Sequence, residues 1–167
     1  MSLHPNTSHS VKVGVVSDTH GYVNPRLAGL LEGVDLILHA GDICGSHVIS
    51  ALEEIAHVVA VSGNNDVKTD TSTYPQEVVV ELAGQRIQLM HQYKVPVRED
   101  HDEVLRCQEA GLAAVVFGHS HSAVNAMLGG ILFFNPGACC KPRFRDIPSI
   151  GLFDLDPEGI RGQILPL

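Results

Sequence analysis

The stretch VKVGVVSDTHG, residues 11 to 21, predicts the fold class of this chain. Its first seven residues are rich in β-branched side chains, a composition typical of a buried strand. Two similar apolar runs follow, DLILHA at 35 to 40 and HVVAVS at 57 to 62. Segments with helical signals separate these runs. Three such strand and helix units in succession predict a parallel sheet covered by helices.

The expected helices have recognisable starts. Asn24 stands directly before a proline. Asparagine is favoured at the N-cap and proline at the first helical position, so a first helix should begin here and run through RLAGLLE. Ser46 is expected to cap a second helix over HVISALEEIA. Asp100 and Glu103 have the spacing of a capping box, which predicts a third helix over HDEVLRCQEA.

The second half of the chain has a different pattern. Residues 76 to 91, QEVVVELAGQRIQLMH, predict a hairpin that turns at Ala83 and Gly84. The further expected strands are LAAVVF (112–117), AVNAML (123–128), ILFFN (131–135), SIGLFDL (149–155) and GIRGQILPL (159–167). We therefore expect an α/β fold, a two-sheet mixed β-sandwich flanked by helices. At 167 residues, it should be a single domain over 11–167 behind a disordered tail of residues 1–10.

Composition narrows the class of protein. The formal net charge of −8 does not favour binding of a long nucleic acid. No apolar run approaches the roughly 20 residues that span a bilayer, and the first residues lack the apolar core of a signal peptide. We therefore expect no membrane association and a cytoplasmic location. The four cysteines show no CxxC spacing, so we expect reduced thiols, with Cys139 and Cys140 as small buried residues.

Polar side chains follow the predicted strands at their carboxyl ends. Ligands of open α/β sheets bind at such ends, so these loops should meet at one rim. The spacing i, i+2 in DTH and HSH should send both side chains of each pair to one face of an extended chain. The side chains expected at the rim are Asp18, His20, Asp42, Asn64, His91, His119 and His121.

Carboxylate, imidazole and amide oxygen together form a donor set suited to divalent ions such as Mn, Fe, Co or Zn. Seven ligands are too many for one tetrahedral ion. They suit two ions about 3.5 to 4 Å apart that share one carboxylate. Taken singly, Asp42 and Asn64 would be ordinary turn residues. Only their place after consecutive strands favours a role as ligands. His39, inside a predicted strand, is expected to be structural.

The order and spacing of D-x-H, GD, GN, H and GHxH resemble the calcineurin-like metallophosphoesterases, within them the small bacterial and archaeal phosphodiesterase branch. The resemblance covers about residues 11 to 155. NPGA at 135 to 138, followed by KPR at 141 to 143, looks like that branch's NPGS…PR segment. The resemblance implies the metallophosphoesterase fold. It also implies one ion held by Asp18, His20 and His121, a second held by Asn64, His91 and His119, and Asp42 as the bridge.

The implied function is that of a metal-dependent phosphodiesterase or phosphoesterase. It would hydrolyse small phosphate esters through a hydroxide that bridges two divalent ions, with Mn preferred and Fe, Zn, Co or Ni as alternatives. Asp42 and Asn64 would be catalytic. Asn65 stands where larger relatives have a histidine thought to assist the leaving group, which makes Asp66 the candidate acid.

Other departures from the family pattern affect the rim. Gln92 stands where a glycine usually follows His91, and Ala138 replaces a common serine. Arg143 is either a phosphate clamp or a surface cation.

Two alternative functions stay open from the sequence. The first is a non-catalytic scaffold, because this branch also resembles a retromer subunit that uses the fold for protein contacts. That scaffold lineage has lost metal ligands, including the GD aspartate, whereas Asp42 is present here. The second is a nuclease of the superfamily, against which the acidic balance and the lack of a basic aromatic strip weigh. Association into a homo-oligomer through edge strands is a further open possibility.

Overall fold

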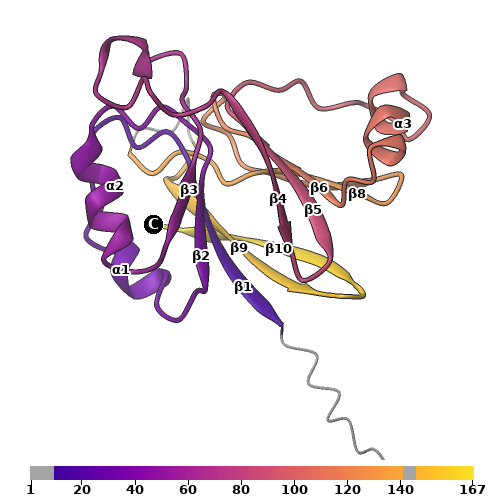
Figure 1. The fold of residues 1–167 in the computed structure, drawn as a ribbon, viewed down its shortest axis with the longest axis horizontal. Coiled ribbons are helices and arrows are strands. Elements are labelled where there is room, and N and C mark those ends of the chain that lie inside the picture. The colour runs from indigo at the N-terminus through magenta and orange to yellow at the C-terminus, as the bar shows by residue number, and fades with distance from the viewer. Residues whose placement is uncertain (1–9, 141–145) are drawn as a thin grey trace, which may run out of the picture.

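The computed structural model describes residues 10–140 and 146–167, which form two sheets packed face to face with helices on the outer faces (Figure 1). The expected two-sheet sandwich with flanking helices is confirmed. Arg143 and residues 1–9 of the expected tail lie outside the described residues.

The first sheet has the strand order β10-β9-β1-β2-β3. The three consecutive strands predicted from the sequence lie side by side in it, with β1 parallel to β2 and β2 parallel to β3. The C-terminal hairpin adds β9 and β10 antiparallel to β1. The bounds are β1 Val11–Val16, β2 Leu36–His39, β3 Val58–Ala60, β9 Ser149–Asp156 and β10 Gly159–Pro166.

The second sheet has the order β4-β5-β6-β8-β7. The predicted hairpin forms its edge as β4 and β5, and Ala83 and Gly84 at the turn both have a positive φ. Strands β5, β6 and β8 are parallel, and β7 returns antiparallel to β8. The bounds are β4 Glu77–Leu82, β5 Gln85–Met90, β6 Ala114–Val116, β7 Val124–Leu128 and β8 Ile131–Asn135.

Three α-helices and one 3₁₀ turn are present in the described part of the chain: α1 Leu27–Leu30, α2 Ser46–Glu53, α3 Asp102–Glu109 and η1 Asp66–Lys68. Figure 1 shows α1 and α2 on the outer face of the first sheet and α3 on that of the second. None of these helices is long and apolar enough to span a membrane.

The helix starts differ from the prediction. Helix α1 is a single turn, and Asn24 lies before it, with its side-chain oxygen accepting a hydrogen bond from the Arg26 N–H at 3.0 Å. Ser46 is the first residue of α2 instead of its cap, and its hydroxyl donates to Asp70. The cap of α3 is His101, whose Nδ1 accepts from the Glu103 N–H at 3.2 Å, and not Asp100.

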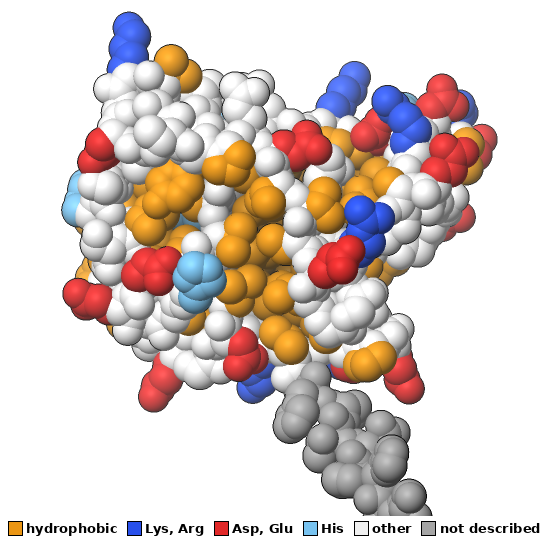
Figure 2. Space-filling model, viewed as in Figure 1, with side chains coloured by type: hydrophobic (Ala, Val, Ile, Leu, Met, Phe, Trp, Pro, Cys, Tyr) orange, Lys and Arg blue, Asp and Glu red, His pale blue; other side chains and the backbone are white. Residues whose placement is uncertain are grey.

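The apolar core has three parts. The largest lies between the two sheets, where Phe134 of β8 meets Phe153 of β9 edge to face at a ring separation of 4.6 Å. A second part joins the first sheet to α1 and α2, and a third joins the second sheet to α3. Figure 2 shows apolar side chains gathered along the face where the edge strands β3 and β4 lie. Val59 and Val80 on these strands are only partly buried against the inter-sheet core.

Candidate metal centre

Five loops at the carboxyl ends of β1, β2, β3, β5 and β6 meet at one rim, the upper edge of the molecule in Figure 1. The structure brings all seven side chains expected there into contact, as two neighbouring groups joined by Asp42.

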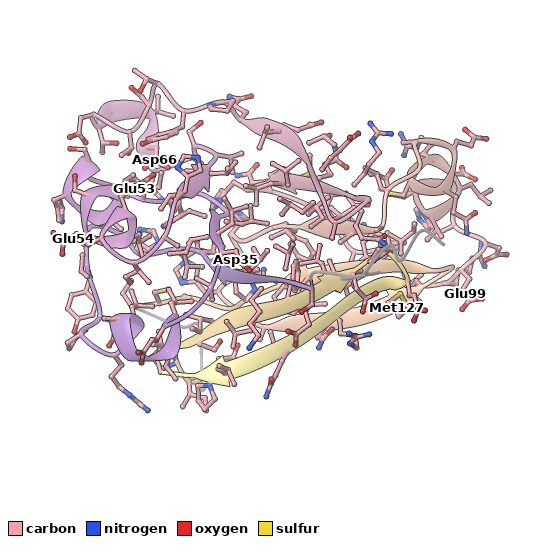
Figure 3. The ribbon with its side chains drawn as sticks, turned by 60° about the horizontal axis from the view of Figure 1, so that its bottom comes forward. Asp35, Glu53, Glu54, Asp66, Glu99 and Met127 are labelled. Carbon is pink, nitrogen blue, oxygen red and sulfur yellow. The ribbon has the colours of Figure 1, made fainter. Side chains whose placement is uncertain are left out.

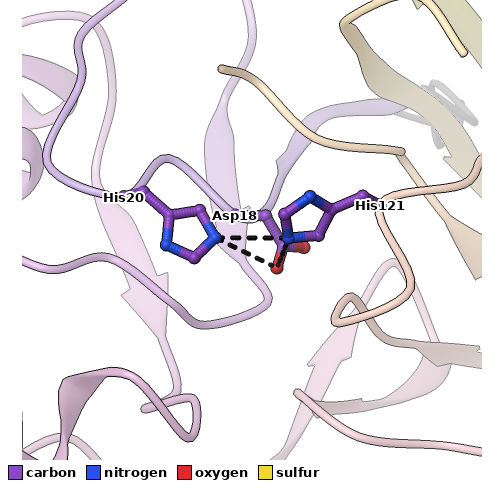
Figure 4. A group of neighbouring side chains, drawn as sticks. All are labelled: Asp18, His20 and His121. Atoms are coloured by element: carbon purple, nitrogen blue, oxygen red, sulfur yellow. Dashed lines mark hydrogen bonds and ion pairs between the residues drawn. The ribbon is translucent and has the colours of Figure 1, made fainter. Parts of the chain in front are cut away.

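The first group consists of Asp18, His20 and His121 (Figure 4). The two imidazole Nε2 atoms are 3.2 Å apart, and Asp18 Oδ1 lies 3.1 Å from that of His121 and 3.9 Å from that of His20. Asp18 is fully buried. Its Oδ2 accepts hydrogen bonds from the Ser17 hydroxyl at 2.6 Å and the His119 N–H at 3.1 Å, which directs Oδ1 toward the two imidazoles.

The second group consists of Asn64, His91 and His119. The Asn64 side-chain oxygen lies 3.1 Å from His91 Nε2 and 3.0 Å from His119 Nδ1. The two imidazole rings meet edge to face at a centroid distance of 5.3 Å. Gln92, the residue that replaces the usual glycine, donates its side-chain amide to the same Asn64 oxygen at 3.2 Å.

Asp42 lies between the two groups. Its Oδ2 is 3.7 Å from His20 Nε2 in the first group and 3.3 Å from His91 Nε2 in the second. Asn65 donates its backbone N–H to Asp42 Oδ1 at 2.8 Å and its side-chain amide to Oδ2 at 2.7 Å. Burial would raise the pKa of Asp42, but the hydrogen bonds from His91 and Asn65 hold that pKa well below its usual value. Asp42 is therefore an anion at neutral pH.

His91 is oriented by the main chain of another loop. Its Nδ1 lies 2.7 Å from the Ala40 carbonyl oxygen, and because that oxygen only accepts, Nδ1 carries a proton. The opposite nitrogen, Nε2, then faces Asp42 and Asn64. Such a carbonyl partner is the usual way in which proteins fix the ring of a metal-binding histidine.

Five of the seven side chains belong to residues with a left-handed backbone. Asp18, His20, Asp42, His119 and His121 have φ between 48° and 67°. This conformation costs non-glycine residues roughly 1 kcal/mol or more each, and such strain gathers at functional sites. The side chains of both i, i+2 pairs do reach the rim, but not because each pair shares one face of an extended chain, as the sequence predicted. Strands β1 and β6 end at Val16 and Val116, and left-handed turns aim the pairs instead.

Glycine is required where two of these loops touch. A Cβ on Gly63 would overlap the Asp42 carboxylate, and one on Gly118 would overlap the Ser17 hydroxyl and stand 2.7 Å from Asp18 Oδ2. The glycines before Asn64 and His119 therefore permit the close packing of these loops.

Asp66 does not reach the rim. It is fully buried, and its carboxylate accepts from the backbone N–H groups of Ile43 at 3.2 Å, Cys44 at 2.7 Å and Gly63 at 2.7 Å. The Thr71 hydroxyl donates a fourth hydrogen bond at 2.7 Å. Figure 3 shows Asp66 at the end of the molecule opposite to Met127 and Glu99. With both oxygens engaged as acceptors, this carboxylate holds the loops after β2 and β3 together.

Asn135 and His39 support the rim from behind through buried polar contacts. The buried side-chain amide of Asn135 donates to the Gly118 carbonyl at 2.8 Å, and its oxygen accepts from the Gly137 N–H at 2.9 Å, so it anchors the GHSH loop. His39 is fully buried, as expected of a structural histidine. Its Nδ1 accepts from the Gly41 N–H at 3.2 Å, and its Nε2 lies 3.0 Å from the Thr19 hydroxyl. It thus ties the DTH loop to the GD loop.

The thiols of Cys44 and Cys139 form no disulfide and are protonated at neutral pH. Burial raises the pKa of Cys44 to about 11 and that of Cys139 to about 12. Cys139 is buried as expected, but Cys140 is half-buried, with its thiol 3.2 Å from the Asp18 carbonyl oxygen. In the described part of the chain, the two groups of side chains close enough together to hold one ion consist of carboxylates and imidazoles and include no cysteine.

The donors fit divalent cations. Asp18 Oδ1 is a buried carboxylate oxygen that accepts no hydrogen bond from any residue that the structure describes. A buried charge left in this way is costly unless a cation neutralises it. The donor atoms of Asp18, His20 and His121 lie close enough together to bind one ion, and so do those of Asp18, Asp42 and His91.

The sequence of this chain is similar to those of several known proteins. Residues 11–158 match the model of the calcineurin-like phosphoesterase superfamily domain. A probable metallophosphoesterase of Methanothermobacter thermautotrophicus is 29% identical over 158 residues, covering 92% of this chain and 91% of that protein. A phosphodiesterase of Methanocaldococcus jannaschii is 27% identical over 174 residues, covering 93% of this chain and 99% of that one.

Solved structures share the fold. A predicted phosphoesterase from Streptococcus pneumoniae superposes with a TM-score of 0.70 at 25% identity, covering 95% of this chain and 90% of that one. Vacuolar Protein Sorting 29 from Cryptosporidium parvum superposes with a TM-score of 0.70 at 22% identity, covering 95% and 98%. At that identity, the second likeness concerns the fold alone.

Proposed function

This chain belongs to the calcineurin-like phosphoesterase superfamily, and from this membership we propose that it is a phosphodiesterase that hydrolyses small phosphate esters with two divalent ions. The observation that carries the proposal is the position of Asp42. One of its carboxylate oxygens lies within 3.7 Å of an imidazole from each group. A carboxylate shared in this way between two ligand sets is what a two-metal site requires.

The proposal gives each rim residue a role. Asp18, His20 and His121 would hold one ion, Asn64, His91 and His119 the other, and Asp42 would be shared. When bound, two divalent ions acidify a water molecule and neutralise charge on the phosphoryl oxygens of the substrate. The manganese ion is the one we expect to support activity best.

The surrounding residues keep these donors in place. Asn65 orients Asp42 through two hydrogen bonds, so this residue supports the shared carboxylate in the position where larger relatives have a histidine. For Asp66 we propose a positioning role, because its buried carboxylate already accepts four hydrogen bonds behind the site. That placement does not favour the leaving-group acid expected from the sequence.

Metal content and activity together test the proposal. We expect the purified chain to bind two Mn²⁺ ions, measured by equilibrium dialysis and elemental analysis, and to hydrolyse bis(p-nitrophenyl) phosphate. Asp42→Ala should abolish turnover with the fold retained by circular dichroism. The matched control is Asp154→Ala, which removes an exposed carboxylate on β9 and should leave both metal content and activity unchanged.

Single ligand variants test the division into two groups. His121→Ala and His119→Ala should each lower the metal content from two ions to one, since each removes a donor from a different group. One ion in the wild-type chain would contradict the two-metal proposal. A folded chain that binds no ion would contradict metal dependence and support the scaffold alternative.

A further inference from the structure

A cavity of about 590 Å³ opens directly beside the second ligand group. Asn64 and His91 form one end of it, and the remaining wall comes from the segment 62–77 and from the end of β5. The volume lies within the range of about 300–1,000 Å³ that is typical of small-molecule sites. A phosphate ester held at the rim would therefore have one substituent next to this cavity.

The wall of the cavity is held by backbone hydrogen bonds. The Ser62 N–H donates to the Pro75 carbonyl at 2.8 Å, and the Tyr74 N–H donates to the Thr71 carbonyl at 3.3 Å. Tyr74 is half-buried and packs against the apolar cluster under the first sheet. Its ring is thus a fixed part of the wall. Met90 of β5, which also lines the cavity, is paired in register with Glu77 of β4.

The chemistry of the lining is specific. Beyond the ligand groups, it offers the hydroxyls and amides of Ser62, Ser72, Gln76 and Gln92, the ring of Tyr74 and the thioether of Met90. Its only charged side chain among the described residues is Glu77, which accepts a hydrogen bond from Gln88 at 2.8 Å. No lysine or arginine of the described chain lines it. A second phosphate group would be repelled there, because like charges disfavour each other at short range.

We propose that this cavity binds the uncharged, ring-bearing alcohol of the phosphate ester, and that the substrate class is a nucleoside phosphodiester without further phosphates. This inference rests on the proposed phosphodiesterase function. An aromatic ring and a polarisable thioether suit the face of a nucleobase. The neutral hydroxyls and amides can both donate to and accept from base and sugar edges.

The first experiment compares two esters with the same leaving group on the manganese-loaded chain. We expect the p-nitrophenyl ester of thymidine 5′-phosphate to have a KM about tenfold lower than methyl p-nitrophenyl phosphate, the effect of stacking one base on an aromatic ring. Tyr74→Ala should remove this difference by raising the KM of the thymidine ester to that of the methyl ester, and Tyr74→Phe should restore it. The control is Met127→Ala, which truncates an exposed side chain on β7 at the far end of the molecule (Figure 3).

The second experiment tests the charge of the cavity. A 3′-phosphate added to the thymidine ester should lower kcat/KM about tenfold, and Glu77→Lys should reverse that loss because it replaces the Glu77 carboxylate with a cation. Binding is measured independently of turnover. In saturation-transfer NMR with the metal-free chain, the thymidine resonances should show saturation transfer from the wild type. They should show none from Tyr74→Ala.

The outcomes separate this inference from the proposed function. If no ester is hydrolysed, the phosphodiesterase proposal fails, while the thymidine NMR experiment still decides whether the cavity binds a nucleoside. If both esters are hydrolysed equally and Tyr74→Ala changes nothing, the nucleoside inference is overturned and the phosphodiesterase stands. A preference for p-nitrophenyl phosphocholine that Glu77→Gln abolishes would also overturn it, in favour of a cationic substituent.

Discussion

Single residues at this rim act mainly by holding one another in place. Three of the seven expected donors are oriented by hydrogen-bond partners outside the donor set, namely Asp18 by Ser17, His91 by the Ala40 carbonyl and Asp42 by Asn65. Removing such a partner should weaken metal binding without removing a ligand. Asp66 and His39 are buried behind the rim, and each makes polar contacts with two of its loops.

Asp66→Asn should separate positioning from acid catalysis. In the variant, the side-chain amide keeps one acceptor oxygen, but its N–H groups face backbone N–H groups that donate to the carboxylate in the wild type. The free energy of unfolding should therefore fall by about 3 kcal/mol. The manganese concentration for half-maximal activity should rise at least tenfold, and the pH profile of kcat should keep its shape. A profile that loses its alkaline limb in this variant would instead identify Asp66 as the acid.

His39 should make stability depend on pH. Burial lowers the pKa of His39 from its usual value of 6.5 to about 4 in the folded chain. The folded state therefore binds fewer protons than the unfolded state between these values. The stabilising contribution is complete above pH 6.5 and declines as the pH falls toward 4, by about 3 kcal/mol in all.

Urea unfolding of the chelator-treated chain at pH 7.5 and at pH 5 measures this effect. His39→Gln should reduce the difference between the two pH values, since the variant has no imidazole to protonate. Because the pKa of Asp42 is lowered, its contribution to stability changes only at pH values below the usual carboxyl pKa. Asp42 therefore does not contribute to the difference between pH 5 and pH 7.5. Equal pH dependence in wild type and variant would contradict the prediction.

At the scale of elements, loops that follow parallel strands make the site. The ends of β1, β2, β3, β5 and β6 come from both sheets, so the rim exists only when the two sheets are packed together. The left-handed turns after these strands bring the loops into backbone contact, as shown by the Asp18 N–H donating to Gly41 and the Gly118 N–H donating to His91, both at 3.0 Å.

Gly118→Ala tests this contact between loops. The added methyl would overlap the Ser17 hydroxyl and crowd Asp18, so the GHSH loop must shift and take His119 and His121 with it. We expect a loss of about 1–3 kcal/mol in stability and at least a tenfold loss of activity with manganese. The matched control is Gly29→Ala in α1, where the new methyl meets nothing within 4 Å and stability should hold or rise slightly. Equal effects of the two substitutions would contradict the predicted role of the close approach.

At the scale of the whole molecule, bound cations should stabilise the fold, because ligands from both sheets meet at one site. A ligand at about 100 times its dissociation constant adds about 2.7 kcal/mol of stability. For a chain of this size, each manganese ion should therefore raise the melting temperature by about 5–10 °C. Differential scanning calorimetry with manganese and with chelator measures the shift. Asp42→Ala should lose most of it, and a wild-type chain that melts at the same temperature in both conditions would contradict a native metal site.

Much of this architecture could be read from periodicity and spacing. β-branched runs identified the strands, and the polar residues at their ends identified the rim side chains, since both are local properties of the sequence. Helix boundaries were less accurate. A capping histidine at His101 and a single-turn α1 depend on contacts with other segments, which local patterns do not record.

The sequence by itself determined which atoms are available at the rim: carboxylate and amide oxygens and imidazole nitrogens, with glycines beside them. Only the tertiary structure decided how they are used. Left-handed turns aim Asp18 and His20, a buried carboxylate at Asp66 joins two loops, and Tyr74 faces a cavity beside His91. The physical reason is that hydrogen bonding and burial depend on neighbours distant in the chain, whereas residue type and spacing are local.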